Sequence, residues 1–253
     1  PLGPRLQLVR AVLVLVCLVS TTLLLQLTVI SSLQHSSAQA RQFDRLRQEL
    51  AIGTAPIGPT DADGDVLPLG TPVAYLEVPS IGLKEVIAEG TTSDVLFDGG
   101  GHRRDTPLPG QIGTSIVLGR RAAFGGPFSD IASLKAGDAI TLTTGQGTFT
   151  YHVIDVRREG DPVPPALDAG SSRLVLVTAS GGAFLPGGVL RVDADLDGVA
   201  VVGPARLLTG STLPARERAM EGDTSTLWAL ALWVQALLVI AVGVVVGWKR
   251  WGR

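Results

Sequence analysis

Cysteine is almost absent from this chain of 253 residues, and its single cysteine, Cys17, lies inside an apolar run. A lone cysteine excludes an intramolecular disulfide and a cysteine-based metal site. Histidine is also scarce, since His35, His102 and His152 are the only three, and their spacing is not that of metal ligands. The sequence therefore predicts neither a metal centre nor a bound cofactor.

Charge is sparse and nearly balanced. Charged residues make up 17% of the chain, and the net charge at pH 7 is -2. A nucleic-acid-binding surface needs a local excess of Lys and Arg, so nucleic acid is not an expected partner. The acidic segment 61–65 is similar to part of a calcium loop, but Pro72 stands where the closing glutamate is required, and we expect a solvated linker there.

Two long apolar runs stand near the two ends of the chain. Residues 11–33 are mostly Val, Leu, Ile and Thr, and residues 227–248 carry no charge and have tryptophans towards both ends. Each run is long enough to cross a hydrocarbon core about 30 Å thick. Basic residues flank both runs on the terminal side. The positive-inside rule therefore predicts a two-span plasma-membrane protein whose ends, 1–10 and the basic tail 249–253, are cytoplasmic.

The first apolar run has an alternative interpretation as a cleaved signal peptide, because the small residues of 36–40 resemble a cleavage site. Its length exceeds a typical signal core and favours a retained anchor. Residues 34–70 are predicted as a juxtamembrane helix followed by a flexible linker rich in Gly, Pro and Asp, and residues 197–226 as a second linker.

The region 71–196 has the pattern of an extracytoplasmic β domain. Short apolar segments alternate with Gly, Pro, Asp or Ser, which predicts strands near 73–78, 84–88, 114–118, 139–143, 148–156, 173–178 and 189–196. Helical patterns are limited to 93–97 and 128–134. Many short strands with little helix predict an all-β fold, namely a closed or nearly closed β-barrel.

Three segments of this region resemble the sortases, bacterial cysteine transpeptidases that attach proteins to the cell wall. They are 73–83, which resembles the family's opening strand, 99–113, which is similar to actinobacterial class E-like sortases, and 118–138, with Leu118-Gly119-Arg120-Arg121, Gly126-Pro127-Phe128 and Leu134-Lys-Ala-Gly137-Asp138. The resemblance implies a sortase-type closed eight-stranded β-barrel with short helices, flanked here by two transmembrane helices.

Sortase chemistry uses a cysteine nucleophile, a histidine that exchanges protons and an arginine that steadies the oxyanion or the substrate. By the resemblance, Arg120 occupies the histidine position, Ala179 occupies the cysteine position, and the arginine is retained as Arg191. A methyl group cannot attack a carbonyl, and a guanidinium that stays protonated cannot act as a general base. The resemblance therefore implies a catalytic site that has lost its nucleophile and its base.

These residues predict a membrane-anchored pseudo-sortase at the bacterial cell envelope, whose cleft binds extended peptides or envelope proteins. With Arg120 and Arg191 near the centre of the cleft, we expect it to favour a carboxylate or another anionic group. The alternative is a divergent, active transpeptidase or hydrolase that acts on cell-wall sorting signals with other groups. A third interpretation is a purely structural anchor, whose two spans bring partners together in the bilayer.

Three further residues are candidates for peptide binding or for substitute chemistry. Thr178 and Ser180 flank the nucleophile position, but adjacent side chains on a strand point to opposite faces, so Ser180 is expected to face away from the cleft. His102 lies in an upstream segment that sortases use structurally, and it would have to approach Ser180 to replace the lost pair. The glycines at 181, 182, 187 and 188 indicate either a mobile loop beside the cleft or a plain turn.

Overall fold

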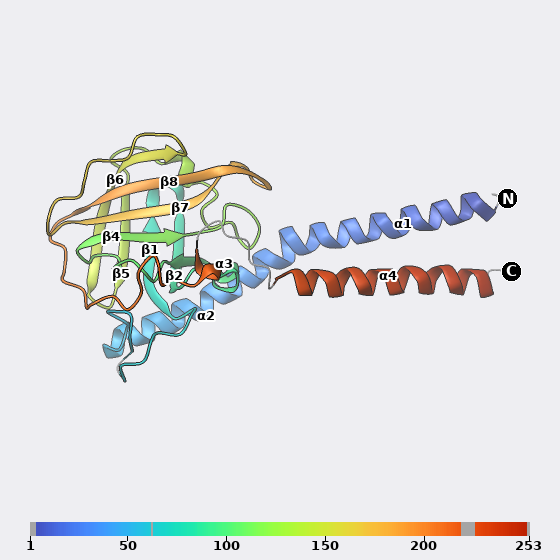
Figure 1. Cartoon of the computed structure of the whole chain (residues 1–253), viewed down its shortest axis with the longest axis horizontal. Helices are drawn as coiled ribbons and strands as arrows, with labels where there is room; N and C mark the ends of the chain where they lie inside the picture. Colours follow the sequence, from blue (N-terminus) through green and yellow to red (C-terminus); the bar gives the residue numbers. More distant parts are fainter. Residues whose placement is uncertain (1–3, 62, 219–225, 252–253) are drawn as a thin grey trace. The chain divides into compact units, whose positions relative to one another are not determined.

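The computed structural model describes residues 4–61, 63–218 and 226–251, and these divide into two compact units. One unit joins the chain's two ends, residues 1–30 and 222–253. It contains helix α1 (Pro4–Leu25), the π-helical turn Gln26–Ile30 and helix α4 (Thr226–Trp251). The other unit, residues 31–221, contains all the strands of the described chain (Figure 1).

One helix in the described chain is long and apolar enough to cross a membrane. It runs over Arg10–Ile52, and its most apolar window has a mean hydropathy of 2.4 and no buried residue. The predicted span at 11–33 lies within it. In α4 the apolar stretch Ala231–Gly243 is shorter than a span, so the crossing at 227–248 stays a prediction. Residues 1–3, 219–225 and 252–253, which belong to the predicted ends and second linker, lie outside the described residues.

The strands of the second unit form a closed barrel in the order β1-β2-β3-β4-β7-β8-β6-β5. Their bounds are β1 Pro72–Val78, β2 Leu83–Glu89, β3 Gly100–His102, β4 Gly113–Leu118, β5 Ala139–Thr144, β6 Gly147–Arg158, β7 Ser172–Gly182 and β8 Leu185–Asp197. The pairs β2–β3 and β4–β7 are parallel, and the other pairs are antiparallel. The predicted closed eight-stranded barrel is confirmed.

Strand alternation places one face of each strand inside the barrel. The core includes Leu76, Ile87, Leu142, Tyr151, Leu176 and Val192, none of which is more than 1% exposed. Tyr151 brings a polar group into this core. Its hydroxyl accepts a hydrogen bond from the backbone N–H of Gly110 at 2.6 Å and lies 2.9 Å from the Ser172 hydroxyl, so the buried oxygen is satisfied.

The structure differs from the sequence prediction at two short elements. Strand β3, Gly100–His102, was not predicted, because two glycines and a histidine have no apolar alternation, and only its pairing with β2 and β4 makes it a strand. The predicted helix at 128–134 is a single 3-10 turn, Ile131–Ser133, because Phe128 is fully buried in the core and fixes the chain before the turn. The short helix expected at 93–97 is present as α3, Ser93–Asp98.

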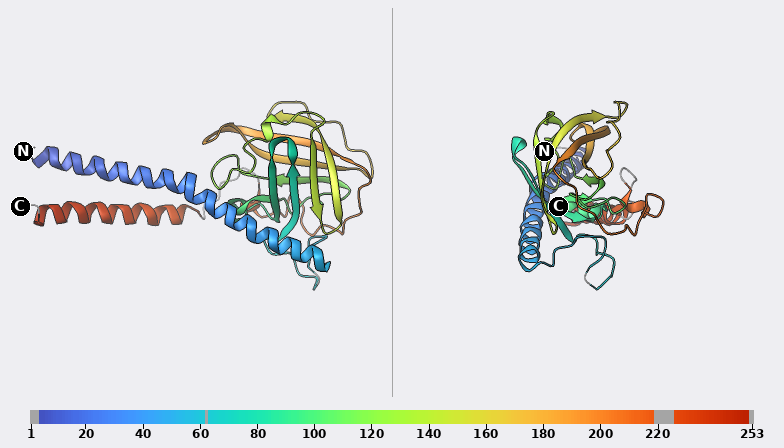
Figure 2. Two further views of the ribbon diagram at one scale, coloured as in Figure 1. Left: turned by 180° about the vertical axis from the view of Figure 1, so that it is seen from behind. Right: turned by 90° about the vertical axis from the view of Figure 1, so that its left-hand side faces the viewer.

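The predicted linkers contact the barrel. Helix α2 (Ser31–Ile52) packs along the outside of β1 and β2 (Figure 2), where Leu46 is 1% exposed. Gln39 accounts for this docking, since its amide accepts a hydrogen bond from the N–H of Val86 and donates to the carbonyls of Val86 and Asp98. These bonds satisfy backbone groups of β2 that β3 is too short to reach. The segment after β8 also returns to the barrel, where Leu213 and Glu217 are buried beside the 3-10 turn Ala215–Glu217.

Candidate functional site

The two positions that the resemblance assigns to the catalytic histidine and cysteine, Arg120 and Ala179, lie towards the same end of the barrel. Strands β4 and β7 are parallel and pair up to Leu118 and Val177. Arg120 lies two residues beyond the end of β4. Ala179 lies two residues beyond the last residue of β7 that pairs with β4, within the part of β7 that continues to Gly182. On the other side of β7, Arg191 of β8 pairs with Val177, while Val189 pairs with Ala179. Residues from three separate segments are thereby brought together.

Alternation decides which of these side chains share a face. Leu174 and Leu176 of β7 belong to the core, so Thr178 and Ser180 lie on their side of the strand, and Ala179 lies on the outer side. In β8, Leu190 and Val192 belong to the core, which places Arg191 on the outer side as well. We call the outer surface formed by Ala179, Arg191 and the loop 119–127 the groove, after the peptide-binding cleft that the resemblance implies.

The loop that borders the groove is fixed by a close approach of Phe128 to Gly119. A Cβ atom at Gly119 would lie 2.5 Å from the Phe128 ring, so no larger residue fits there. The N–H of Phe128 donates to the carbonyl of Arg120 at 3.0 Å, and the Thr178 hydroxyl donates to the carbonyl of Gly119 at 2.8 Å. Thr178 thus ties the end of β7 to the start of the loop instead of facing the groove.

Arg120 is held by aromatic rings and a carbonyl. Its guanidinium carbon lies 4.4 Å from the centre of the Phe97 ring and 5.3 Å from that of Phe124, and the two rings stack with centroids 4.2 Å apart. Its Nε donates to the carbonyl of Leu96 at 3.0 Å. Burial lowers the pKa of Arg120 from its usual value. The side chain is therefore directed at α3 rather than at Ala179, which differs from the expected pairing of Arg120 with Arg191 in the cleft.

The cation beside Ala179 is Arg121, which sequence reasoning did not single out. Its Nη1 donates to the carbonyl of Ala179 at 3.1 Å. The only sequence signal was its place in the Arg-Arg pair, and only the course of the loop distinguishes the two arginines. Arg191, by contrast, lies directly opposite Arg157 of β6.

Positive charge in the groove is not neutralised. Arg157 forms a two-point ion pair with Asp193, with N–O distances of 2.5 and 3.3 Å. Among the residues that the structure describes, no carboxylate lies within ion-pair distance of Arg121 or Arg191. The guanidinium groups of Arg121, in the loop after β4, and of Arg191, within β8, are therefore available to an anionic ligand.

The loop also contains backbone strain. Ala123 and Phe124 have φ angles of 56° and 46°, the only positive values among the described non-glycine residues. A left-handed conformation costs a residue with a Cβ about 1–2 kcal/mol. The loop keeps this conformation because the Phe124 ring stacks on Phe97 and its N–H donates to the Ser31 hydroxyl at 3.1 Å.

Replacing Ala123 with glycine should therefore stabilise the protein. Glycine adopts positive φ without penalty, and after its greater freedom in the unfolded chain is subtracted we expect a gain of about 0.5–1 kcal/mol. The control is A122G, because Ala122 has no positive φ and the same substitution should destabilise. Thermal denaturation of both variants measures the effect, and a lower midpoint for A123G would contradict the strain.

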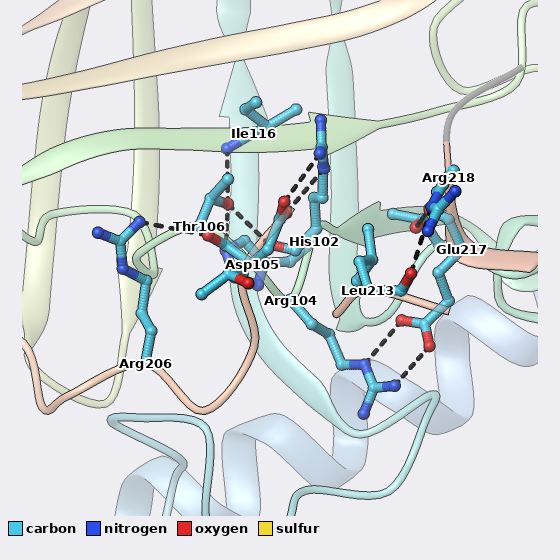
Figure 3. Close-up of polar contacts among 12 residues, drawn as sticks. His102, Arg104, Asp105, Thr106, Ile116, Arg206, Leu213, Glu217 and Arg218 are labelled. Atoms are coloured by element: carbon cyan, nitrogen blue, oxygen red, sulfur yellow. Dashed lines mark hydrogen bonds and ion pairs between the residues drawn. The ribbon is translucent and has the colours of Figure 1, made fainter. Parts of the chain in front are cut away.

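His102 lies in a separate buried network (Figure 3). Its Nδ1 lies 2.8 Å from a carboxylate oxygen of Glu89, and its Nε2 lies 3.0 Å from the carbonyl of Pro107 and 3.2 Å from the Thr106 hydroxyl. Burial alone lowers the pKa of His102, but the charge and hydrogen bond of Glu89, the Pro107 carbonyl and the charge of Asp105 together outweigh it, so the pKa is raised. Both ring nitrogens have acceptors, and the charged imidazolium is the form that suits this site.

His102 and Ser180 are not brought together. His102 pairs with Val117 in β4, and Val117 pairs with Leu176 in β7, so two strand spacings separate His102 from Leu176. Ser180 lies four residues further along β7, about 13 Å at the rise of a strand. A Cβ atom at Gly188 would lie 3.1 Å from the Ser180 hydroxyl and 3.2 Å from a Glu159 carboxylate oxygen, so the ionisable group bordering Ser180 is Glu159.

The chain is similar to known proteins. Residues 76–181, which include Arg120 and Ala179 but not Arg191, match the family model of the sortase domain. Sortase D of Bacillus subtilis (strain 168) is 32% identical over 88 residues, which are 35% of this chain and 43% of that protein. The match therefore spans less than half of that relative's length.

The chain is also similar to solved structures. A sortase D5 transpeptidase from Clostridium perfringens superimposes with a TM-score of 0.52 at 23% identity, covering 64% of this chain and 99% of that one. Sortase E from Streptomyces avermitilis is 32% identical, with a TM-score of 0.45, and the match covers 52% of this chain and 91% of that one.

The barrel, with its parallel β4 and β7 ending beside a polar loop, has the fold of a transpeptidase domain. The chain belongs to the sortase family, whose members are cysteine transpeptidases.

Proposed function

We propose that this protein is a membrane-anchored pseudo-sortase, which binds an extended peptide or an envelope protein in the groove without transpeptidase chemistry. The observation that carries the proposal is the position of Ala179. It lies in β7, two residues beyond the end of the pairing with β4 and one cross-strand diagonal from Arg191, yet the chain's only thiol is Cys17 in α1. The groove therefore has a bordering loop and positively charged side chains, but the nucleophile position has no thiol.

In this proposal α1 anchors the protein in the plasma membrane, and residues 71–196 form the extracytoplasmic barrel. A second crossing at 227–248 places both termini, 1–10 and 249–253, in the cytoplasm, and the segments 34–70 and 197–226 connect the spans to the barrel. The apolar helix Arg10–Ile52 supports the first crossing. A signal peptide is the alternative for this helix. The basic residues after 248 support the second crossing.

The ligand is proposed to carry a carboxylate or another anion. Arg121 and Arg191 supply uncompensated positive charge on the outer face of β7 and β8. An extended peptide is the proposed ligand because strands and the loops that follow them commonly bind peptides in extended form.

The alternative, an active enzyme that uses other groups, is favoured by one observation only. The Ser180 hydroxyl borders Gly188, as the Glu159 carboxylate does, and a hydroxyl near a carboxylate could serve a hydrolase. Ser180 lies on the core side of β7 and is 9% exposed, and His102 is bonded at both nitrogens elsewhere. These contacts favour the binding function over the enzyme.

The experiment titrates the full chain in detergent or nanodiscs with paired sorting-signal peptides, one acidic and one neutral, in the presence of an amine acceptor. We expect the acidic peptide to bind more tightly, with no cleavage of either. R191Q should weaken binding of the acidic peptide about tenfold, or about 1.4 kcal/mol, and leave the neutral peptide unchanged.

The control is R47Q, which removes a charge from an exposed part of α2, where Arg47 pairs weakly with Asp44 at 3.5 Å. Cleavage that disappears in S180A would establish the enzyme instead. Equal affinity for the two peptides would contradict the anionic ligand, and the absence of any peptide binding would favour the structural anchor.

A further inference from the structure

The strands β7 and β8 continue beyond the barrel as a two-stranded ribbon (Figure 1). The pairing of β4 with β7 ends at Val177, and that of β6 with β8 ends at Leu190. The pairing of β7 with β8 goes on through Ala179–Val189 and Ser180–Gly188 to Gly182–Leu185. The glycines that predicted a loop or a turn therefore form a hairpin, whose turn is at residues 183–184.

The tip of this hairpin is apolar and uncovered. Phe184 is 63% exposed and Leu185 is 82% exposed, and every residue from 181 to 187 is classed as exposed. No charged residue occurs between Ala179 and Leu190. Exposed ribbons normally carry charges that prevent pairing with other chains, and a tip of Phe, Leu and Pro without one indicates a surface that is covered in the working protein.

The position of the tip within residues 31–221 indicates what covers it. Ser31, the first residue after the π-helical turn of the apolar N-terminal segment, accepts a hydrogen bond from the N–H of Phe124. The loop that contains Phe124 begins at Arg121, which bonds to the carbonyl of Ala179, where the free ribbon starts. Ser31 and the base of the hairpin therefore lie at the same end of the barrel. The tip extends five residues further, about 16 Å along the strand.

The charge at the base of the hairpin is consistent with a membrane surface as the partner of the tip. Arg121 and Arg191 have no carboxylate partner among the described residues, and Arg158 ends β6 beside Leu190. One carboxylate, that of Glu159, borders Gly188 at the same base, so the basic groups outnumber it. An apolar tip next to basic residues is the composition of segments that insert shallowly at the boundary of headgroups and acyl chains.

We propose that the β7–β8 hairpin inserts Phe184 and Leu185 into the outer surface of the membrane that anchors the chain, with the arginines at its base facing anionic headgroups. This inference rests on the membrane anchoring in the proposed function. Insertion of the hairpin would fix the orientation of the barrel on the bilayer. Since Ala179 begins the hairpin, it also keeps the groove at the membrane surface, where an envelope ligand embedded in the same bilayer would reach it.

Single-cysteine labelling of the full chain in nanodiscs tests the proposal. An environment-sensitive fluorophore is attached to the native Cys17, to C17S/F184C and to C17S/V199C, and nitroxide quenchers are placed on lipids near the headgroup or deep in the acyl chain. Val199 is the matched control, because it is 88% exposed and apolar but follows the opposite end of β8.

We expect the label at 184 to shift to shorter wavelength and to be quenched by the shallow nitroxide, the label at 17 to be quenched by the deep nitroxide, and the label at 199 to respond to neither. Quenching at 17 without quenching at 184 would overturn the hairpin proposal and leave the anchoring intact. No quenching at 17 would overturn the anchoring and the hairpin proposal together.

Two further results are decisive. A blue shift at 184 without lipid quenching would mean that another protein or a second copy covers the tip, and it would overturn insertion into lipid. Adding L185D to C17S/F184C should abolish the quenching at 184, because a charge at the tip opposes burial in the acyl region. Quenching that survives this substitution would also count against the proposal.

Discussion

Introducing a cysteine at Ala179 and a histidine at Arg120 should create transpeptidase activity, which the chain lacks under the proposed function. The double variant A179C/R120H places a thiol in β7 and an imidazole just after β4, at the positions that the resemblance assigns to the two groups. It also removes the guanidinium that Phe97 and the Leu96 carbonyl hold at α3. A thiol alone is mostly protonated near neutral pH, and a positioned base contributes about 10²–10⁴-fold. We therefore expect A179C alone to be alkylated without turnover, and the double variant to cleave a sorting-signal peptide.

The assay follows release of the leaving peptide and transfer to an amine, in a C17S background so that alkylation reports the new thiol only. The control is V189C/R120H, because Val189 lies directly opposite Ala179 on β8 and places a thiol one strand away. Activity of the unmodified chain would contradict the loss of chemistry. A double variant that folds and is alkylated at 179 but shows no cleavage would contradict the proposal that the groove still binds a peptide in the geometry that the reaction needs.

Removing the carboxylate of Glu217 should cause a large loss of stability. Glu217 is fully buried and receives two hydrogen bonds from Arg104, one of them from Nε at 2.7 Å (Figure 3). Its backbone carbonyl also accepts a hydrogen bond from the Thr91 hydroxyl. Deleting one member of a buried ion pair leaves the other charge without compensation, and E217A should lower the free energy of unfolding by about 3 kcal/mol or more.

The charge origin of this effect can be separated from lost packing. R104L/E217L removes both charges and should cost less than E217A, since no unpaired ion remains. R45A is the exposed control, because the Arg45–Glu49 pair on α2 should contribute no more than about 0.5 kcal/mol. All four tryptophans lie at or beyond 228, so unfolding of the barrel is followed by circular dichroism. A loss below about 1 kcal/mol for E217A would contradict the argument.

Glu217 also shows which contacts of the predicted linkers their composition does not indicate. The sequence 197–226 has Gly, Pro and scattered charges, and nothing local indicates that one glutamate pairs with Arg104, 113 residues earlier. The same holds for residues 34–70, where Gln39 docks α2 on β2 through backbone groups. Composition reports the local flexibility of a segment, but docking depends on groups that are distant along the chain.

The strands were predictable because their apolar alternation is a local signal. Seven of the eight strands lie where the pattern placed them. Strand β3 was not predicted, because Gly100–His102 is a strand only through its pairing with β2 and β4. The motif Gly126-Pro127-Phe128 was visible as a resemblance. The physical reason for the motif is the close approach of the Phe128 ring to Gly119, which only the tertiary structure reveals.

The sequence by itself determined the all-β barrel, the single thiol in an apolar helix and the absence of a nucleophile at Ala179, because residue identity and alternation are properties of the chain. Only the tertiary structure decided which arginine lies beside Ala179. Arg120 and Arg121 are adjacent and chemically identical, yet one contacts α3 and the other β7. The direction of a side chain after a turn depends on the path of the backbone, which residue type alone does not specify.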